Sequence, residues 1–283
     1  MIMTAARRRV YLFGNPSKPH AREAIEKLQK SAATKFEVVG TSLGKQIADG
    51  AREADRIIVV GGDGTLIGVA RSLGSRQIPL IGVNVGKLGF LAEFSLDDLA
   101  NDLDRAVNDD SLISRRAALD VQIENGGVRH SSPAINDCVI QAGPPFRMIT
   151  LGVKLDGDHL SNVAGDGLIV CTPSGSTAHN LSAGGPILQP DVDAMILTPL
   201  NAHSLTHKPI VVNRESKLEI TAVTVNEGTT AIIDGQEPHA LRHADRVIIR
   251  RYPHDFLLVR NPRHGRWHNL VTKLHWGQAP SYE

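Results

Sequence analysis

The sequence predicts an α/β domain with a parallel sheet, followed by a mainly β domain. Short, fully apolar runs alternate with helix-like segments in the first third of the chain, as in IIVVGG at 57–62. Such runs are typical of parallel strands that are covered on both faces. After about residue 115 the pattern changes to short strands joined by Asn-Gly or Asp-Gly turns, which is typical of antiparallel hairpins. We therefore expect an α/β nucleotide-binding domain over 1–115, a β-rich domain over 116–260 and a C-terminal tail over 261–283.

The first domain is predicted to contain a parallel, Rossmann-like sheet, because helix-like segments separate its apolar runs. Ser95 is the expected N-cap of the last helix, since acidic residues follow it in the first turn. The expected elements are strands at 10–13, 36–40 and 57–60, an apolar run at 78–86, and helices at 21–30, 65–73 and about 96–110.

The second domain is predicted from its turn residues. Asn125-Gly126, Asp156-Gly157 and Asp234-Gly235 each lie between strand-like runs, and such dipeptides favour two-residue hairpin turns. RVIIRR and DFLLVR add further strand-like runs near the end of this domain. The C-terminal tail has no clear period, and we expect it either to dock on the body of the protein or to be partly mobile.

Composition excludes several classes of function. With 31 basic and 30 acidic residues the net charge is +1. The chain therefore lacks the overall positive charge that would indicate a nucleic-acid partner. No stretch approaches the roughly 18 consecutive apolar residues of a membrane span. The two cysteines, Cys138 and Cys171, form neither a CxxC pair nor a disulfide framework, so a reducing, cytoplasmic location is the simplest interpretation.

The stretch Gly61-Gly62-Asp63-Gly64-Thr65 follows a predicted buried strand and opens a helix. Backbone N–H groups and the helix dipole favour an anion at such a place, and glycines allow it to approach closely. The stretch is neither a Walker A loop nor GxGxxG, because no Lys-Ser or Lys-Thr follows and Ile67 stands at the third glycine. A carboxylate would repel a phosphate, so Asp63 is predicted to face a hydroxyl or a metal ion. The alternative is a tight turn in which Asp63 merely N-caps the helix.

Two further stretches contain polar residues next to apolar runs. AGDGLIVCTPSGSTAHNLSAGGPIL at 164–188 offers many hydroxyl and backbone donors with little bulk, which suits a hydroxylated or phosphorylated ligand. Its alternative is a Gly/Ser loop between strands. Asn136 and Asp137 lie inside a strand-like run, where one of them should face inward and need a partner, such as a ribose diol or an adenine amine. A surface Asn-Asp pair is the alternative, and Asp234-Gly235-Gln236 alone indicates a hairpin turn.

The histidines do not form a recognisable metal motif. His203 and His207 are four residues apart, as are His239 and His243, but the surrounding pattern is strand-like and HExxH is absent. We therefore expect structural or surface roles for most of them. GxSxG is also absent, and Cys171 lies in an apolar run that predicts a core position.

Taken together and in this order, the stretches resemble the NAD kinase family, whose members phosphorylate NAD to NADP with ATP. GGDGT alone also occurs in relatives of phosphofructokinase and diacylglycerol kinase, so the combination carries the resemblance. It covers about residues 10–260 and implies an α/β domain, a β-rich domain and an active site between them. The matching stretches are GGDGT at 61–65, NVGKLGFL at 84–91, IND at 135–137, DGLIVCTPSGSTAHNLSAGGPIL at 166–188, AHSLTHKPIVV at 202–212 and DGQ at 234–236.

The resemblance also implies roles for single residues. Asp63 would be the catalytic base for the 2′-hydroxyl of the adenosine ribose of NAD, while that oxygen attacks the γ-phosphoryl group of ATP. A divalent cation such as Mg²⁺ would accompany ATP, and the protein would be a homodimer or homotetramer. Departures from the family pattern are His179, where many members have Tyr, and Ala164, where many have a larger polar or basic residue. The implied substrate-binding residues are Gly62, Gly64, Thr65, Asn136, Asp137, Arg147, Asp166, Ser174, Thr177, Ala178, His179, Asn180, Ser182 and Gln236.

Two other functions are compatible with parts of this pattern. One is a non-catalytic regulator that binds NAD or NADP and has lost turnover. The other is a lipid or sugar kinase that shares only GGDGT. The intact Asp63 favours an enzyme over the regulator, and the long stretch at 166–188 favours NAD over a lipid or sugar.

Overall fold

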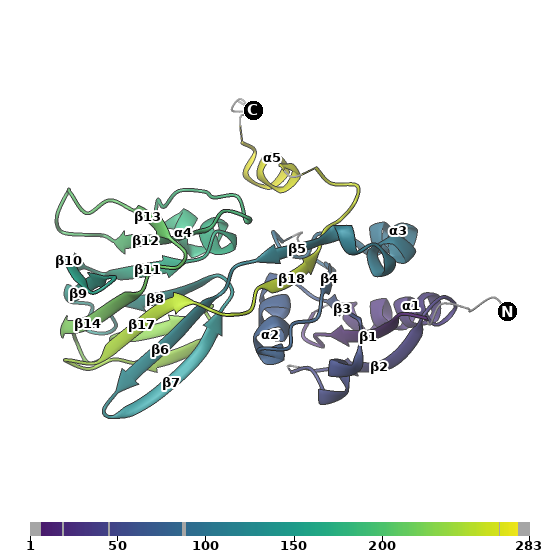
Figure 1. The fold of residues 1–283 in the computed structure, drawn as a ribbon, viewed down its shortest axis with the longest axis horizontal. Coiled ribbons are helices and arrows are strands. Elements are labelled where there is room, and N and C mark those ends of the chain that lie inside the picture. Colours follow the sequence, from purple (N-terminus) through teal and green to yellow (C-terminus); the bar gives the residue numbers. More distant parts are fainter. Residues whose placement is uncertain (1–6, 19, 45, 87–88, 266, 277–283) are drawn as a thin grey trace. The chain divides into compact units, whose positions relative to one another are not determined.

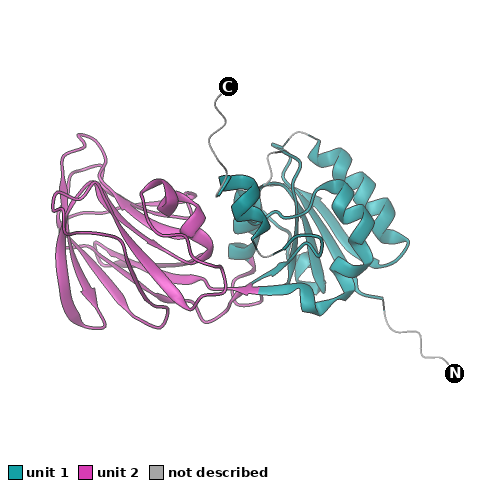
Figure 2. Cartoon of the chain, turned by 90° about the horizontal axis from the view of Figure 1, so that it is seen from above, with its two compact units in different colours: residues 1–72, 78–114, 257–283 teal, residues 73–77, 115–256 magenta. Residues whose placement is uncertain are grey.

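The structure, a computed structural model, describes residues 7–18, 20–44, 46–86, 89–265 and 267–276. The chain forms two compact units, which Figure 2 shows in different colours. The first unit contains residues 1–72, 78–114 and 257–283, and the second contains residues 73–77 and 115–256. The chain thus passes from the first unit to the second near residue 114 and returns near residue 257.

A six-stranded, mostly parallel sheet runs through the first unit (Figure 1). Parallel pairing joins β1 to β2 and β3, and β4 to β3 and β18. Residues 57–60 of β3 are completely buried, as their apolar sequence predicts for a strand that is covered on both faces. The strand order is β2-β1-β3-β4-β18-β5, with β1 Arg9–Gly14, β2 Glu37–Leu43, β3 Arg56–Val60, β4 Leu80–Val83, β5 Ile113–Arg116 and β18 Phe256–Val259.

Helices lie on both faces of this sheet. α1 (Ala21–Ala33) and α3 (Leu96–Asn108) share one core with alternate residues of β1, β3 and β4. α2 (Asp63–Leu73) lies on the other face, where a Cβ at Gly82 would come within 2.6 Å of the Leu66 side chain. Ser95 caps α3 in a reciprocal capping box with Asp98, which confirms the predicted N-cap. Two short 3₁₀ helices, η1 (Asp49–Glu53) and η2 (Asp110–Leu112), complete the unit's connections.

The C-terminal part of the chain belongs to the first unit. The run DFLLVR, which the sequence analysis assigned to the β-rich domain, forms β18 and pairs with β4. Apolar alternation marks a strand but does not say which sheet it joins, because pairing is a long-range property. The tail then forms α5 (His268–Leu274), where Asn269 donates a hydrogen bond to the Phe90 carbonyl oxygen (3.3 Å). The described part of the tail therefore docks on the body of the first unit.

The second unit consists of two six-stranded antiparallel sheets around one shared core. Val121 and Ile249 enter this core from one sheet, and Val170 and Ile233 enter it from the other. The first sheet has the order β10-β9-β14-β17-β6-β7, with β6 Leu119–Asn125, β7 Val128–Ala134, β9 Ile149–Leu155, β10 Asp158–Gly165, β14 Leu218–Thr224 and β17 Arg246–Arg251. The second has the order β13-β12-β11-β8-β15-β16, with β8 Asp137–Gln141, β11 Gly167–Cys171, β12 Ala194–Leu200, β13 Ile210–Asn213, β15 Thr230–Ile233 and β16 Glu237–Ala240.

Hairpin turns form at the predicted dipeptides, with one shift. Asp156-Gly157 and Asp234-Gly235 connect β9 to β10 and β15 to β16, with positive φ at both residues of each turn. Between β6 and β7 the positive φ angles lie at Gly126 and Gly127, one residue later than expected, because Asn125 still pairs with Val128. Cys138 and Cys171 are buried free thiols, and Cys171 has the core position that its apolar run predicts. None of the helices in the described residues is long and apolar enough to cross a membrane.

Candidate functional site

The carboxyl ends of three parallel strands bring polar residues together in the first unit. Asn15 follows β1, Gly61 follows β3 and Asn84 follows β4. Backbone hydrogen bonds continue the pairing past the strand ends, from Asn15 N to the Val60 oxygen (3.2 Å) and from Gly61 N to the Val83 oxygen (2.9 Å). The Asn15 side chain donates to Thr65 Oγ1 at 3.3 Å. This edge is where open parallel sheets usually bind their ligands.

Asp63 is the first residue of α2, and its carboxylate accepts three backbone hydrogen bonds from the segment 89–92. Its Oδ2 accepts from Phe90 N at 2.7 Å, and its Oδ1 accepts from Leu91 N and Ala92 N at 3.0 Å each. The carboxylate is therefore directed toward a neighbouring loop, which differs from the alternative of a helix N-cap. A carboxylate has about four lone-pair directions, so about one remains for a further donor.

Two glycines permit this arrangement. A Cβ at Gly89 would lie 1.9 Å from Asp63 Oδ1, so only glycine lets the loop approach the carboxylate. A Cβ at Gly61 would lie 2.6 Å from Thr65 Oγ1. Gly62 is half-buried with open space beside its α-carbon, and Gly64 is exposed. The sequence stretch at 84–91 includes residues 87 and 88, which lie outside the described residues.

Lys273 of α5 also lies near Asp63, although no sequence pattern marked it. Its Nζ is 4.8 Å from the centroid of the Phe90 ring. Burial lowers the pKa of Lys273, while the charges of Asp63 and Glu93 act to raise it. Within the described part of the chain, this Nζ is a buried atom without a hydrogen-bond partner. A lone lysine in NLVTKL carries no local signal, because about 210 residues separate it from Asp63 and only folding brings them together.

In the second unit, three of the stretches found in the sequence meet. The Asp234 carboxylate, in the turn between β15 and β16, accepts hydrogen bonds from the backbone N–H groups of Ile135, Asn136 and Asp137 at 2.7–3.1 Å. Thr172 binds the same segment, through its N–H to the Asn136 oxygen (2.8 Å) and its Oγ1 to the Ile135 oxygen (2.7 Å). DGQ thus forms the predicted hairpin turn and also fixes the IND segment.

Two buried polar atoms at this meeting point have no protein partner. Asn136 Oδ1 and Ser174 Oγ are both inaccessible, and neither has a hydrogen-bond partner among the described residues. Leaving such an atom unpaired costs roughly 1–3 kcal/mol, so unpaired atoms mark places where a ligand group can bind. The two segments are in close contact, because a Cβ at Gly175 would lie 2.2 Å from the Asn136 carbonyl oxygen.

Asp137 is a buried carboxyl beside this point. Burial, and secondarily the negative charge of Asp234, raise the pKa of Asp137 to about 7. Removal from water disfavours the charged form, and the neighbouring carboxylate adds repulsion. A ligand that offers an N–H or O–H group to this carboxyl would relieve part of that cost.

The hydroxyl-rich loop is held by residues that the sequence analysis counted as ligands or donors. Asn180 is fully buried; its Nδ2 donates to the Ser176 and Pro186 oxygens, and its Oδ1 accepts from Thr198 Oγ1. Ser176 is also fully buried and bonds to the Pro173 and Leu188 backbone. The Asn180 amide is thus hydrogen-bonded within the protein through both its nitrogen and its oxygen, and its predicted ligand contact stays a prediction. Sequence pattern does not show which polar side chains in a loop turn inward.

The remaining predicted residues lie at or near the surface of the second unit. Thr177 and Ala178 are half-buried between η3 (Ser174–Thr177) and α4 (His179–Ser182). Asp166 accepts a hydrogen bond from Asn201 Nδ2 at 2.8 Å. Arg147 lies in the loop between β8 and β9. The exposed residues of this group are Arg147, Asp166, His179, Ser182 and Gln236.

A parallel sheet with a glycine-rich turn and a carboxylate at its carboxyl edge, followed by a β unit with unpaired buried polar atoms, is typical of a nucleotide-binding protein. A family model of the ATP-NAD kinase N-terminal domain matches residues 12–111, and one of the C-terminal domain matches residues 135–261. These matches cover most of the chain, which therefore belongs to the NAD kinase family.

Relatives and solved structures agree with this assignment. The chain is 40% identical to the NAD kinase of Geotalea daltonii over 80% of each protein. It is 36% identical to the NAD kinase of Rhodopirellula baltica over 95% of this chain and 86% of that protein. An NAD kinase of Archaeoglobus fulgidus in complex with ATP has a TM-score of 0.77 at 25% identity and covers 94% of this chain and 98% of its own. Yeast NADH kinase complexed with NADH shares the fold, with a TM-score of 0.87 at 21% identity over 99% of this chain and 91% of its own.

Proposed function

We propose that this protein transfers the γ-phosphoryl group of ATP to the 2′-hydroxyl of the adenosine ribose of NAD and so makes NADP. The family assignment and the NAD kinase relatives support the reaction. The observation that carries the chemistry is the Asp63 carboxylate, which three backbone N–H groups hold in one orientation beside a glycine-rich turn.

Asp63 is the proposed catalytic base. The reaction forms a bond between the ribose O2′ and the γ-phosphorus and breaks the bond between that phosphorus and ADP, while the hydroxyl proton passes to the Asp63 carboxylate. The transition state of phosphoryl transfer is loose, and the proton can leave late. Correct orientation of the hydroxyl therefore contributes as much as basicity.

ATP is the proposed donor and enters with a divalent cation such as Mg²⁺, which neutralises part of its phosphate charge. Gly62, Gly64 and Thr65 are proposed to contact the phosphates. The backbone N–H groups at the start of α2 and the open space beside Gly62 support this role.

The NAD-binding residues of the proposal lie in the second unit. Asn136 and Asp137 are proposed to bind the adenosine part, supported by the unpaired Asn136 Oδ1 and the buried Asp137 carboxyl. Ser174 has an unpaired Oγ that can bind another polar group of the dinucleotide. The further proposed contacts are Arg147, Asp166, Thr177, Ala178, His179, Ser182 and Gln236.

Cellular location and assembly also belong to the proposal. The free thiols of Cys138 and Cys171 suit a reducing, cytoplasmic compartment. A homodimer or homotetramer is proposed from the family resemblance.

The test compares wild type with Asp63→Asn. NADP formation from NAD, ATP and Mg²⁺ is measured with an NADP-specific dehydrogenase, and NAD binding is measured by calorimetry. We expect the variant to bind NAD within a few-fold of wild type but to turn over about 10²–10⁴-fold more slowly, because an amide cannot take the hydroxyl proton and keeps only one of the two oxygens that accept hydrogen bonds from residues 90–92.

Asp104→Asn, at an exposed position on α3, is the control and should keep full activity. Wild type that binds NAD but forms no NADP would indicate the non-catalytic regulator instead. Wild type that neither binds nor phosphorylates NAD would indicate a lipid or sugar hydroxyl as the acceptor.

A further inference from the structure

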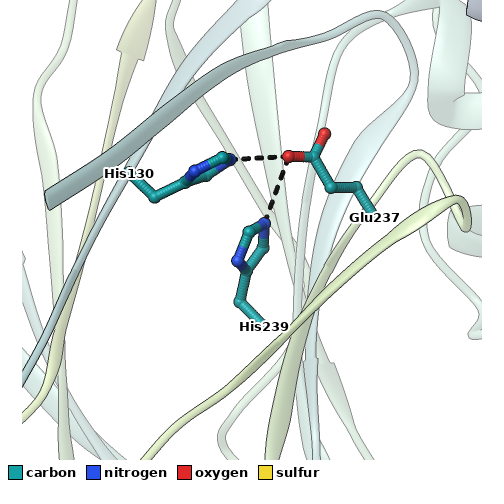
Figure 3. A group of neighbouring side chains, drawn as sticks. All are labelled: His130, Glu237 and His239. Carbon is teal, nitrogen blue, oxygen red and sulfur yellow. Dashed lines mark hydrogen bonds and ion pairs between the residues drawn. The ribbon is translucent and has the colours of Figure 1, made fainter. Parts of the chain in front are cut away.

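Two histidines and a glutamate meet outside the proposed reaction site. His130 Nε2 lies 2.6 Å from Glu237 Oε1, and His239 Nε2 lies 3.3 Å from the same oxygen (Figure 3). The two imidazole rings are 4.2 Å apart between centroids and tilted by 38°. One ligand atom from each of the three residues lies within 4.8 Å of the others.

The backbone places these side chains on facing strands. His130 belongs to β7, the edge strand of one sheet, whereas Glu237 and His239 belong to β16, the edge strand of the other. Glu237 and His239 are two residues apart on one strand, so their side chains point to the same face. All three are half-buried, which leaves them accessible to an ion from solvent.

The spacing suits a tetrahedral metal ion. Bonds of about 2.0–2.2 Å at tetrahedral angles separate neighbouring ligand atoms by roughly 3.4 Å. The Nε2 to Oε1 distance is already 3.3 Å for His239, and the 2.6 Å distance for His130 needs to open by less than about 1 Å. Rotation about side-chain bonds can supply this change without moving either strand.

The donor set identifies the class of metal. Two neutral imidazoles and one carboxylate, without a thiolate, suit Zn²⁺ and leave one coordination position for water. Ser132 Oγ donates a hydrogen bond to Glu237 Oε2 at 3.0 Å, which leaves Oε1 directed at both histidines. A hydrogen bond from a neighbouring residue of this kind commonly orients a metal ligand.

We propose that His130, Glu237 and His239 bind one Zn²⁺ ion and that the ion joins the edges of the two sheets of the second unit. Glu237 follows directly after the turn 234–236, whose Asp234 fixes the IND segment. The bound ion therefore stabilises the second unit and the turn that supports the proposed NAD-binding residues. The metal site itself does not depend on the proposed reaction.

The test uses full-length, chelator-treated protein without nucleotide, titrated with Zn²⁺ in a calorimeter. We expect one equivalent per chain and a rise in Tm of roughly 5–10 °C at a hundredfold excess of ion over Kd. His130→Gln and His239→Gln should each weaken binding by about 100-fold or more, and Ser132→Ala by about tenfold. Co²⁺ should give the visible absorption of a tetrahedral nitrogen- and oxygen-liganded site in wild type but not in His130→Gln or His239→Gln.

Two histidine variants serve as controls. His159→Gln changes an exposed histidine on β10, and His268→Gln breaks the stacked pair that His268 forms with His264 at 3.8 Å. Both should bind Zn²⁺ as wild type does. The proposal is wrong if wild type shows no saturable binding and no Zn²⁺-dependent Tm, if His130→Gln and His239→Gln keep wild-type affinity, or if His268→Gln abolishes binding. The wild-type Tm and Co²⁺ measurements decide the matter even if a variant does not fold.

Discussion

Asp137 illustrates how one buried side chain links stability to pH. Its pKa is raised to about 7 by burial and by Asp234, whereas an aspartate in the unfolded chain has a pKa of about 3.9. The folded state therefore binds the proton more tightly than the unfolded state does. The protonated carboxyl contributes its full stabilisation of the folded state below about pH 4, the pKa of the unfolded chain. That contribution is lost as the pH rises to about 7, and it stays constant above that value. The difference of about three units corresponds to at most roughly 4 kcal/mol.

Replacing Asp137 with Asn removes this pH-dependent penalty. We expect Asp137→Asn to raise the Tm at pH 8 by several degrees, and the gain over wild type to shrink as the pH falls toward 4. The same variant should bind NAD about tenfold more weakly, because the proposal has this carboxyl accept a hydrogen bond from the ligand. Thermal unfolding between pH 4 and pH 8 measures the first effect, and calorimetry measures the second.

The control is Asp158→Asn, which changes an exposed aspartate on β10 of the same unit. It should shift neither the Tm profile nor NAD affinity. A Tm gain from Asp137→Asn that is equally large at pH 4 and pH 8 would show that the carboxyl is not titrating in this range.

At the scale of elements, the loop that follows β4 determines where the Asp63 carboxylate points. Gly89→Ala would place a Cβ 1.9 Å from Asp63 Oδ1, so the carboxylate or the loop must move. We expect NADP formation to fall by at least about 10²-fold, because a displacement of about 1 Å at the reacting groups has an effect of this size. The coupled dehydrogenase assay measures the loss.

Gly86→Ala is the matched control in the same loop. Its Cβ would lie 3.7 Å from Asn84 Oδ1, an ordinary contact, so activity should stay within a few-fold of wild type. Equal activities for the two variants would mean that the contact between the loop and Asp63 does not matter for turnover.

The short helix α5 brings a positive charge toward the same carboxylate. Lys273 has a pKa lowered by burial and lies over the Phe90 ring, in the loop that holds Asp63. We expect Lys273→Met to lower kcat about tenfold or more with a smaller change in the KM for NAD, because the Lys273 charge interacts with the carboxylate of Asp63, the proposed base. Steady-state kinetics separate kcat from KM.

Lys35→Met removes an exposed lysine just after α1 and serves as the comparison. It should leave both constants unchanged. If Lys273→Met had the kcat and KM of wild type, Lys273 would have no role in turnover, and α5 would be a purely structural segment.

At the scale of the whole molecule, two edge strands of the second unit expose apolar side chains. β10 ends one sheet and β13 ends the other, and exposed residues there include Leu160 and Val211. Leu205, in the segment before β13, is 86% exposed. Uncovered apolar edge strands favour pairing with another chain, so they suit the interface of the proposed homo-oligomer.

A charge on this edge should disrupt such an assembly. We expect wild type to elute as a dimer or tetramer in size-exclusion chromatography with light scattering, and Val211→Lys to shift the mass toward the monomer. Val223→Lys, which changes an exposed valine on the inner strand β14, should not change the mass. A wild-type monomer at micromolar concentration would contradict the proposed assembly.

The sequence by itself determined the elements and the candidate residues of this protein. Apolar runs predicted β3, a capping serine predicted the start of α3, and Asp-Gly pairs predicted two hairpin turns, because periodicity, caps and turn angles depend on neighbours in the chain. The order of the motifs indicated the family through its resemblance to the NAD kinases.

Only the tertiary structure decided which of these residues meet and in what role. In the structure, the Asp63 carboxylate accepts hydrogen bonds from the N–H groups of residues 90–92, and the Asp234 carboxylate accepts them from residues 135–137. Asn180 is buried and hydrogen-bonded to its own loop. The tertiary structure also brought Lys273 to Phe90 and His130 to Glu237, which no spacing indicated. The most widely separated of these pairs, Lys273 and Phe90, lies about 180 positions apart in the sequence. These contacts arise from strand pairing and sheet packing, which leave no local pattern in the sequence.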